Sequence, residues 1–281
     1  MKTFLGISLF FSILVSSTLL AQDLQGIATY KTQRKMDVEL DSTKMDDGMR
    51  AQVMAMLKKQ FEKEYNLQFT PTESIYKEVE KLEAPGNNMS FMRMEVMTVG
   101  DAGDILYKNL KEKRFTSQNE VFSKQFLIMD SIEDPEWKLE KETKNIGEYT
   151  CFKATYTRMV SVVNSIRSSD DDSEAQEERE EEQTITAWYT PQIPIGNGPG
   201  RYGGLPGLIL EVSDGQQTIL CSKIVLNPKN GISIAEPKDG KKVSEEEFEA
   251  IMDKKMKEMN ERYENNDGRD DGHRIEIRIG G

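Results

Sequence analysis

The sequence predicts a mainly β protein of the α+β class, built as a curved antiparallel meander sheet with two amphipathic helices packed on it. Short segments rich in β-branched and aromatic residues recur at close spacing between residues 26 and 226, separated by turns that contain Gly, Asn and Pro. Only two stretches carry apolar residues at the spacing of an amphipathic helix. Strands that follow one another so closely, with few helices between them, pair as antiparallel neighbours.

The individual strands are expected where apolar and polar residues alternate. In segment 207–213, Leu208, Leu210 and Val212 alternate with Glu211 and Ser213, as a strand with one buried face requires. The other strands are expected at 26–38, 67–69, 74–79, 89–99, 104–108, 113–117, 121–129, 136–143, 148–162, 183–190, 217–226 and, as a charged terminal strand, 273–279.

Two helices are expected, over residues 45–65 and 243–264. Apolar residues recur every three or four positions in both ranges, which gives each helix one apolar stripe. Ser244 and Glu247 have the spacing of a capping box at the start of the second helix. Because both stripes need a concave surface to bury them, the specific architecture favoured is a half-barrel like that of the periplasmic lipoprotein carriers.

The first 21 residues have the features of a cleaved secretory signal. Lys2 precedes an apolar run from Phe4 to Val15, and polar residues then lead to Ala21, after which cleavage is expected. The apolar run is shorter than the ~20 residues that a membrane-spanning helix needs, and no Cys follows it for acylation. We therefore expect a soluble exported protein, periplasmic or secreted and not a lipoprotein, with no membrane span after signal removal and with residues 22–281 forming a single domain.

The acidity of the chain is concentrated in one run. The net charge is −12, from 37 Lys and Arg against 49 Asp and Glu, and residues 170–182 contain nine acidic residues against Arg179 alone. Like charges at this density repel one another, so 165–182 is expected to be a disordered acidic loop between two strands. The acidic balance excludes a protein that binds the nucleic-acid backbone, and a single His excludes a multi-histidine metal site.

The two cysteines, Cys151 and Cys221, fall in separate expected strands. In an oxidising compartment they are candidates for a disulfide, which would close a loop of about 70 residues and stabilise the fold by about 4 kcal/mol. Two separate buried thiols are the alternative, because the sequence does not tell whether the two strands are close enough. A catalytic Cys is not expected, since the single histidine, His273, lies in a tail rich in Gly and Asp.

A segment rich in glycine and proline, Gly196–Gly207, precedes the strand 207–213. It contains the spacing G-x-G-x-x-G, but Pro199 interrupts it and a strand rather than a helix follows, so a phosphate-binding loop is not expected. Its composition is typical of a set of tight turns. Side chains beside these turns are either core residues at strand ends or the platform of a ligand site. The candidate platform residues are Trp188, Tyr189, Arg201 and Tyr202.

The segment Tyr202–Val212, with the sequence YGGLPGLILEV, resembles the signature of the GLPGLI family, exported proteins of Bacteroidetes named after that hexapeptide. The signature turn and strand consist of Gly204, Leu205, Pro206, Gly207, Leu208 and Ile209. Further matching segments lie at 72–76, 126–128, 137–139, 149–154 and 186–194, whereas the acidic run at 165–182 is longer than the resemblance leads us to expect. The resemblance implies an exported, mainly β domain and carries over no catalytic residue, cofactor or established activity.

The expected function is that of a non-catalytic cell-envelope binding protein for an apolar ligand or an envelope partner, since Met-rich helix stripes adapt to varied apolar shapes. A protein–protein adaptor associated with an outer-membrane transport system, which would use a sheet edge or the acidic loop, is the alternative. Cu(I) handling by the thioethers of Met92 and Met94 and hydrolysis by a pair of carboxylates are the less favoured hypotheses. No cofactor and no resident metal are expected.

Overall fold

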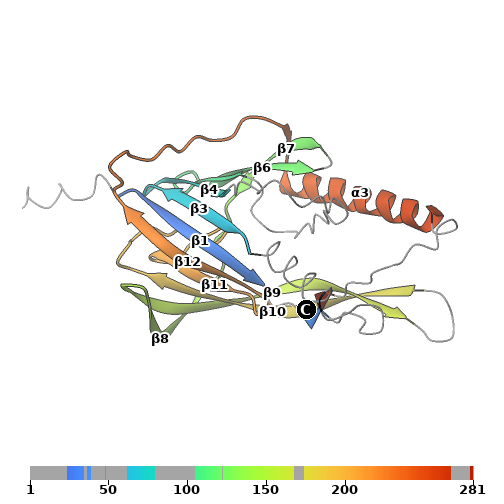
Figure 1. The fold of residues 1–281 in the computed structure, drawn as a ribbon, viewed down its shortest axis with the longest axis horizontal. Helices are drawn as coiled ribbons and strands as arrows, with labels where there is room; N and C mark the ends of the chain where they lie inside the picture. Colours follow the sequence, from blue (N-terminus) through green and yellow to red (C-terminus); the bar gives the residue numbers. More distant parts are fainter. Residues whose placement is uncertain are drawn as a thin grey trace, which may run out of the picture.

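The computed structural model describes residues 24–34, 37–38, 48, 62–79, 105–121, 123–167, 174–266 and 279–280, and most of them lie in strands (Figure 1). The strands are β1 (Gly26–Arg34), β2 (Asp37–Val38), β3 (Glu64–Phe69), β4 (Glu73–Glu78), β5 (Ile105–Asn109), β6 (Arg114–Val121), β7 (Lys124–Ser131), β8 (Lys138–Ile146), β9 (Tyr149–Arg167), β10 (Glu174–Thr190), β11 (Leu208–Ser213), β12 (Gln217–Leu226), β13 (Lys241–Val243) and β14 (Ile279–Gly280), and the helix is α3 (Glu245–Asn266). The structure confirms the prediction of a mainly β fold.

Twelve of the strands form one open, curved sheet in the order β13-β7-β6-β5-β4-β3-β1-β12-β11-β10-β9-β8. Strands β3 to β7 form one antiparallel meander and β8 to β12 form a second. The first strand joins the two meanders, because β1 pairs with β3 on one side and with β12 on the other. The short strand β13 is added parallel to β7. The first strand of the sequence is therefore one of the central strands of the sheet.

The inner face of the sheet, defined here as the face that carries Tyr30, Leu67 and Tyr76, holds the main hydrophobic core. The ring of Tyr76 stacks on that of Tyr65 with 4.8 Å between the centroids and meets Tyr30 edge to face at 6.3 Å. The buried hydroxyl of Tyr30 donates a hydrogen bond of 2.7 Å to the carbonyl oxygen of Ile209. This bond joins β1 to β11 across β12, which lies between them in the sheet. Because it draws the two strands together on the inner face, it supports the curvature of the sheet.

A second hydrophobic cluster packs on the opposite side of β9, β10 and β11. Ile209 and Val212 belong to this cluster, whereas Leu208 and Leu210 belong to the main core. The prediction that Leu208, Leu210 and Val212 share one face is therefore wrong. The pairing of β11 with β10 shifts its register between Ile209 and Glu211, which makes Leu210 the extra residue of a β-bulge. Such an extra residue reverses the faces of the residues beyond it.

The helix α3 begins beside β7 and extends away from the sheet (Figure 1). The expected capping box is present, because the Glu247 N–H donates to the Ser244 hydroxyl and the Ser244 N–H donates to the Glu247 carboxylate, both at 3.1 Å. The ring of Phe248 packs edge to face on Phe126 of β7 with 5.4 Å between the centroids, and Met252 is buried. The first turns of the apolar stripe therefore attach the helix to the sheet.

The prediction of a second helix over 45–65 is wrong at the C-terminal end of that range. Gly48 is helical, but Glu64 and Tyr65 lie in β3, because Tyr65 continues the alternation of buried residues that leads to Leu67 and Phe69. Residues 62 and 63 are described as well and are not helical. Outside the described residues lie residues 45–47 and 49–61 of that range, the expected signal at 1–21, the expected strand at 89–99 and residues 273–278 of the expected terminal strand.

The acidic run is the largest correction to the expected secondary structure. Residues 174–182, which were expected to form part of a loop, belong to β10 and pair in register with residues 159–167 of β9. The paired part of β9 contains the β-branched residues Val160, Val162, Val163 and Ile166, which favour a pleated strand over a helix. For Glu180, Glu181 and Glu182, whose side chains the structure describes, pairing in a strand puts neighbouring carboxylates on opposite faces. The pairing of β10 with β9 therefore continues as far as Glu174 despite the repulsion between the carboxylates.

The segment 227–240 crosses the outer face of the sheet between β12 and β13. The Ser233 N–H donates to the Gln68 side chain at 3.3 Å. Farther along, both carboxylate oxygens of Glu236 accept hydrogen bonds from the guanidinium of Arg114, at 2.6 and 3.1 Å, and one of them also accepts from the Thr116 hydroxyl at 2.6 Å. These bonds lower the pKa of Glu236 below its ordinary value of 4.5, chiefly because Arg114 stabilises the carboxylate.

Replacing Glu236 by Gln is expected to lower the free energy of unfolding by about 1 kcal/mol at neutral pH, a value that allows for solvent screening of this partly exposed pair. A carboxylate whose pKa is lowered by folding stabilises the fold above its unfolded-state pKa, and this contribution disappears as the pH falls through the folded-state value. The difference between Glu236→Gln and the unaltered protein, measured by urea unfolding, should therefore shrink in acid. A difference that grows in acid would contradict this assignment.

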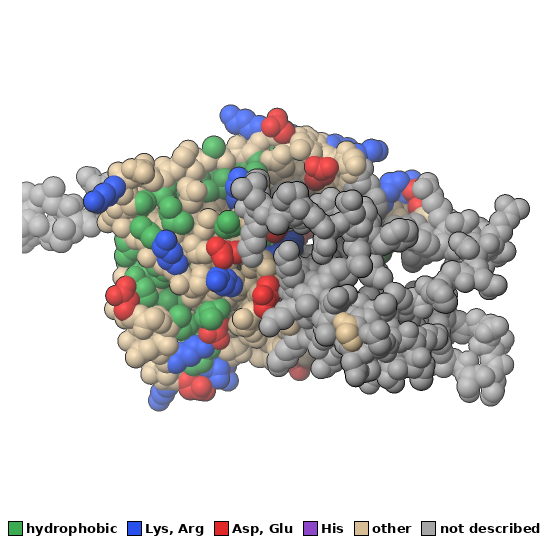
Figure 2. Space-filling model, in the orientation of Figure 1, with side chains coloured by type: hydrophobic (Ala, Val, Ile, Leu, Met, Phe, Trp, Pro, Cys, Tyr) green, Lys and Arg blue, Asp and Glu red, His purple; other side chains and the backbone are tan. Residues whose placement is uncertain are grey.

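Hydrophobic and charged side chains are mixed on the face that Figure 2 shows. Among the described residues, the exposed large apolar side chains come from five different elements. They are Met129, Leu139, Met159, Leu220, Leu226 and Met256. A search of the described helices finds none with the length and apolar character that crossing a membrane requires.

Candidate functional site

The glycine-rich segment connects β10 to β11 and contacts both hydrophobic clusters. Ile193 and Ile195, which precede it, are buried in the main core, and Leu205 is buried in the second cluster. Gly204 has a φ of +79°, which favours glycine. Gly207 passes so close to the end of β10 that an added Cβ would lie 2.2 Å from the carbonyl oxygen of Thr190. The segment that resembles the family signature therefore forms a turn, and Gly204 and Gly207 make that turn possible.

Lys108 of β5 holds this segment against the inner face. Its ammonium group donates to the carbonyl oxygens of Gly198, Gly200 and Tyr202 at 3.1, 2.8 and 3.0 Å. The residue is 2% exposed, and only a protonated amine can donate to all three carbonyls at once. Burial lowers the pKa of Lys108 to about 7, while the carboxylate of Asp134 acts in the opposite direction.

Lys108 is not among the residues that the sequence marks as functional candidates. A signal was available, because Lys108 lies two positions after Leu106 in the expected strand 104–108 and therefore shares its buried face. The three acceptors, however, lie 90 to 94 residues farther along the chain. No local pattern relates β5 to the glycine-rich segment.

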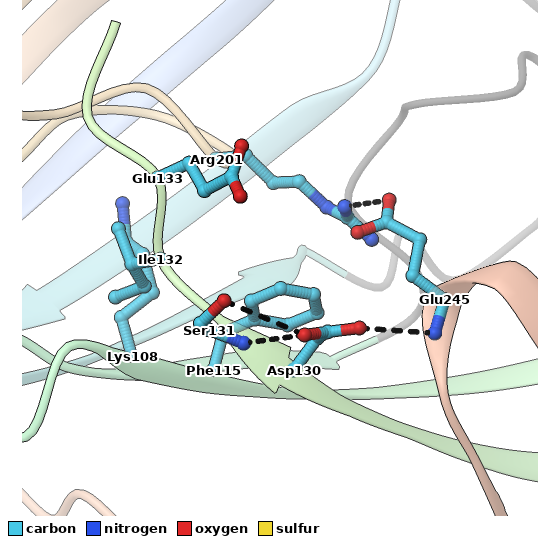
Figure 3. A pocket seen from close by; sticks show the side chains of 8 residues that line it. All are labelled: Lys108, Phe115, Asp130, Ser131, Ile132, Glu133, Arg201 and Glu245. Atoms are coloured by element: carbon cyan, nitrogen blue, oxygen red, sulfur yellow. Dashed lines mark hydrogen bonds and ion pairs between the residues drawn. The ribbon is translucent and has the colours of Figure 1, made fainter.

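A pocket of about 340 Å³ opens beside Lys108, between the glycine-rich segment, the start of β6, the end of β7 and the start of α3 (Figure 3). Its lining residues are Lys108, Phe115, Asp130, Ser131, Ile132, Glu133, Arg201 and Glu245. The guanidinium carbon of Arg201 lies 4.4 Å from the centroid of the Phe115 ring, and one of its terminal nitrogens forms an ion pair with the Glu245 carboxylate. The Arg201 side chain thus bridges the sheet and the helix along one wall of the pocket.

Asp130 closes the other side of the pocket with backbone contacts. One of its carboxylate oxygens accepts from the Ser131 N–H at 2.8 Å, and the other accepts from the N–H of Glu245 at 3.4 Å. Glu245 is the first residue of α3, so Asp130 receives one of the N–H groups that a helix start leaves unpaired. These contacts position the helix start relative to the pocket.

The four residues expected to form a ligand platform do not form one surface. Trp188 packs against the main core, with the Lys144 ammonium 4.3 Å from its ring centroid, whereas Tyr189 belongs to the second cluster on the opposite side of the strand. Tyr202 contacts both clusters, and its carbonyl oxygen accepts from Lys108. Arg201 is the member that lines the pocket of about 340 Å³. Neighbouring strand residues face opposite sides, which separates Trp188 from Tyr189.

Both cysteines are free thiols in the structure and belong to the main core. Cys151 donates to the Tyr149 carbonyl and Cys221 donates to the Lys223 carbonyl. Burial raises the pKa of Cys151 to about 11 and that of Cys221 to about 12. Thiols with such pKa values are poor nucleophiles at neutral pH. The disulfide between Cys151 and Cys221 stays a prediction.

Among the described residues, no group of three or more His, Cys, Asp and Glu side chains is placed to hold a metal ion. Met92 and Met94, the residues of the copper hypothesis, lie outside the described residues.

Comparison with known proteins finds one family model that matches part of the chain. The family is described as a protein of unknown function (Porph_ging), and the match covers residues 137–211. This range extends from Trp137, ahead of β8, through the glycine-rich segment to Glu211 in β11. A comparison with curated proteins finds no match.

Among solved structures, two of PNGF-II resemble the chain. The structure of PNGF-II in space group C2 has a TM-score of 0.45 and 14% identity, and the match covers 81% of this chain and 32% of that one. The structure in space group P21 has a TM-score of 0.46 and 13% identity, with 81% and 33% covered. The chain therefore spans about a third of the length of each PNGF-II chain.

Proposed function

We propose that the chain is an exported, non-catalytic binding protein of the GLPGLI family, with a half-barrel sheet whose ligand site is the pocket beside Lys108. The single observation that carries this proposal is the pocket itself. Its volume of about 340 Å³ lies at the lower end of the range of small-ligand sites, and five separate parts of the chain line it. The signal-like residues 1–21 support export, and the letter-for-letter match to the hexapeptide supports the family.

The lining of the pocket favours a polar ligand over an apolar one. Five of its eight lining residues are charged, and Phe115 and Ile132 are its apolar members. An apolar molecule would have to displace water from these charges without replacing their hydrogen bonds, which is costly. The site therefore suits a small polar molecule that gains contact area from one aromatic and one aliphatic side chain.

The described nucleophile candidates support binding rather than catalysis. The Cys151 and Cys221 thiols are buried and have raised pKa values. The Lys108 ammonium gives all three of its donors to backbone carbonyls, so this side chain is engaged in holding the glycine-rich segment. The two thiols therefore contribute to the packing of the core, and Lys108 supports the glycine-rich segment.

The test is a thermal-shift screen of the purified protein against a panel of small polar metabolites that includes cations, anions and zwitterions. Ser131→Trp, which fills the pocket from an exposed lining position, is the blocking variant, and Lys111→Trp in the exposed turn between β5 and β6 is its control. We expect at least one compound to raise the melting temperature of the unaltered protein and of Lys111→Trp but not of Ser131→Trp. No stabilising compound, or stabilisation that persists in Ser131→Trp, would refute the proposal.

A second candidate function, that of a protein–protein adaptor in an envelope transport system, is favoured by the β9–β10 hairpin. Strand β8 pairs with β9 only as far as Thr155, and β11 pairs with β10 only from Thr186. Beyond these points β9 and β10 pair with each other, out to Arg167 and Glu174. A two-stranded ribbon is marginally stable on its own in water, and a partner that packs on it would stabilise it. The outer part of the β9–β10 hairpin therefore suits the role of a contact surface.

Shortening this hairpin tests the adaptor function directly. Replacing residues 160–181 by a two-residue Asn–Gly turn preserves the register of the remaining pairs. If the hairpin is the adaptor surface, proteins crosslinked to the unaltered chain in the cell envelope should be absent from the shortened one, while the small-molecule screen gives the same result for both. An unchanged set of crosslinked proteins would refute the adaptor role.

A further inference from the structure

Two charged groups that line the pocket have unused hydrogen-bonding capacity. The carboxylate of Glu133 forms no hydrogen bond or ion pair with any residue that the structure describes, and the residue is exposed. The guanidinium of Arg201 uses one terminal nitrogen for Glu245, and its Nε–H is buried without a partner among the described residues. Within the described part of the chain, therefore, the pocket is lined by one carboxylate without a partner and by one guanidinium that is paired through a single terminal nitrogen.

The other charged groups of the pocket are already engaged. Lys108 is bonded to three carbonyl oxygens, and Asp130 accepts from two backbone N–H groups. Glu245 is paired with Arg201. Figure 3 shows these interactions around the pocket, with no dashed line to Glu133. Glu133 and Arg201 are thus the two groups from which a ligand can gain charge-assisted hydrogen bonds.

We propose that the ligand of this pocket is a small zwitterion, a molecule with a primary ammonium and a carboxylate, of the size of an amino acid or a very short peptide. Its ammonium binds the carboxylate of Glu133, and its carboxylate binds the guanidinium of Arg201. This inference rests on the proposed binding function and specifies its ligand class.

Molecules with one sign of charge fit the pocket less well. A simple anion that binds Arg201 would lie in a pocket that also holds the carboxylates of Asp130, Glu133 and Glu245. A simple cation at Glu133 would leave the donor capacity of Arg201 unused and would share the pocket with two positive charges. A zwitterion meets both groups, and Phe115 and Ile132 contact its carbon chain.

The experiment is a calorimetric titration of the purified protein with glycine, glycylglycine and triglycine, which vary the distance between the two charges. N-acetylglycylglycine lacks the ammonium, and glycylglycinamide lacks the carboxylate. We expect one of the free zwitterions to bind at least about tenfold more tightly than either blocked form, which corresponds to about 1.4 kcal/mol. Blocked forms that bind within about twofold of the free form, or no binding by any of the three zwitterions, would overturn the inference.

Variants assign the two charges separately. Glu133→Gln should abolish the preference for the free form over the N-acetyl form and keep the preference over the amide, and Arg201→Met should do the reverse. Glu136→Gln on the same connecting segment and Arg158→Met on β9, both exposed, are the matched controls. Because Arg201 also pairs with Glu245, Arg201→Lys is included, and circular dichroism checks that each variant is folded.

The two experiments distinguish a failure of the zwitterion inference from a failure of the proposed function. If the metabolite screen finds a stabilising compound of one charge sign that Ser131→Trp no longer binds, the pocket is a binding site and the zwitterion inference is wrong. If the screen finds nothing that depends on the pocket, both are wrong.

Discussion

Replacing Lys108 by Met is expected to lower the free energy of unfolding by at least about 3 kcal/mol. The substitution keeps most of the aliphatic chain but removes the donor for the carbonyls of Gly198, Gly200 and Tyr202. Because these contacts are buried, each carbonyl that loses its donor costs about 1–3 kcal/mol unless water or a shift of the segment replaces it. Urea unfolding followed by tryptophan fluorescence measures the effect.

The matched control for this prediction is Lys111→Met. Lys111 lies in the exposed turn that follows β5, so its replacement should change the free energy of unfolding by less than about 0.5 kcal/mol. A Lys108→Met protein as stable as the control would mean that the three carbonyls find other partners. The view of Lys108 as the support of the glycine-rich segment would then be wrong. Since Lys108 lines the pocket, the same variant should also lower the affinity of any ligand that binds there.

Replacing Gly207 by Ala is expected to destabilise the protein by about 3 kcal/mol for a purely steric reason. An added Cβ would lie 2.2 Å from the carbonyl oxygen and 2.6 Å from the carbonyl carbon of Thr190, which are backbone atoms and cannot rotate away. Thr190 is fully buried at the end of β10, so relief requires the strand end and the turn to separate. Thermal or urea unfolding monitored by circular dichroism gives the measurement.

Gly215→Ala separates this steric effect from the general cost of replacing a glycine. Gly215 has a φ of +92° and no atom within 4 Å of an added Cβ, so only backbone strain of about 1–2 kcal/mol is expected. Gly207→Ala should therefore be clearly the more damaging of the two substitutions. Equal effects would show that the close approach to Thr190 relaxes without cost.

The strands were predictable because their signals are local. Buried residues alternate along β1, β3 and β4, and the turn residues that separate strands can be read directly from the chain. The capping box at Ser244 is equally local, since both of its hydrogen bonds join residues three positions apart. Predictions failed where a neighbouring strand decided the outcome, as it did for the acidic residues from Glu174 onward, which pair with β9.

The candidate site was much less predictable than the strands. Arg201 was identified because it lies beside the glycine-rich turns, and it does line the pocket. Trp188, Tyr189 and Tyr202 were grouped with it by sequence proximity, but the sheet places them in different packing environments. Lys108, Glu133 and Glu245 were missed, because a charged residue in a strand, a connection or a helix start has no unusual local pattern.

By itself, the sequence determined the class of the fold, the approximate positions of most described strands, the start of the C-terminal helix and the need for glycine at the turn before β11. All of these depend on side-chain alternation, turn chemistry or capping, which act over a few residues. Only the tertiary structure decided that β1 joins two meanders, that Lys108 supports a segment 90 to 94 residues away and that Glu133 and Arg201 line one pocket. The physical reason is that these features depend on contacts between distant segments, which form only when the sheet curves and brings its two meanders together.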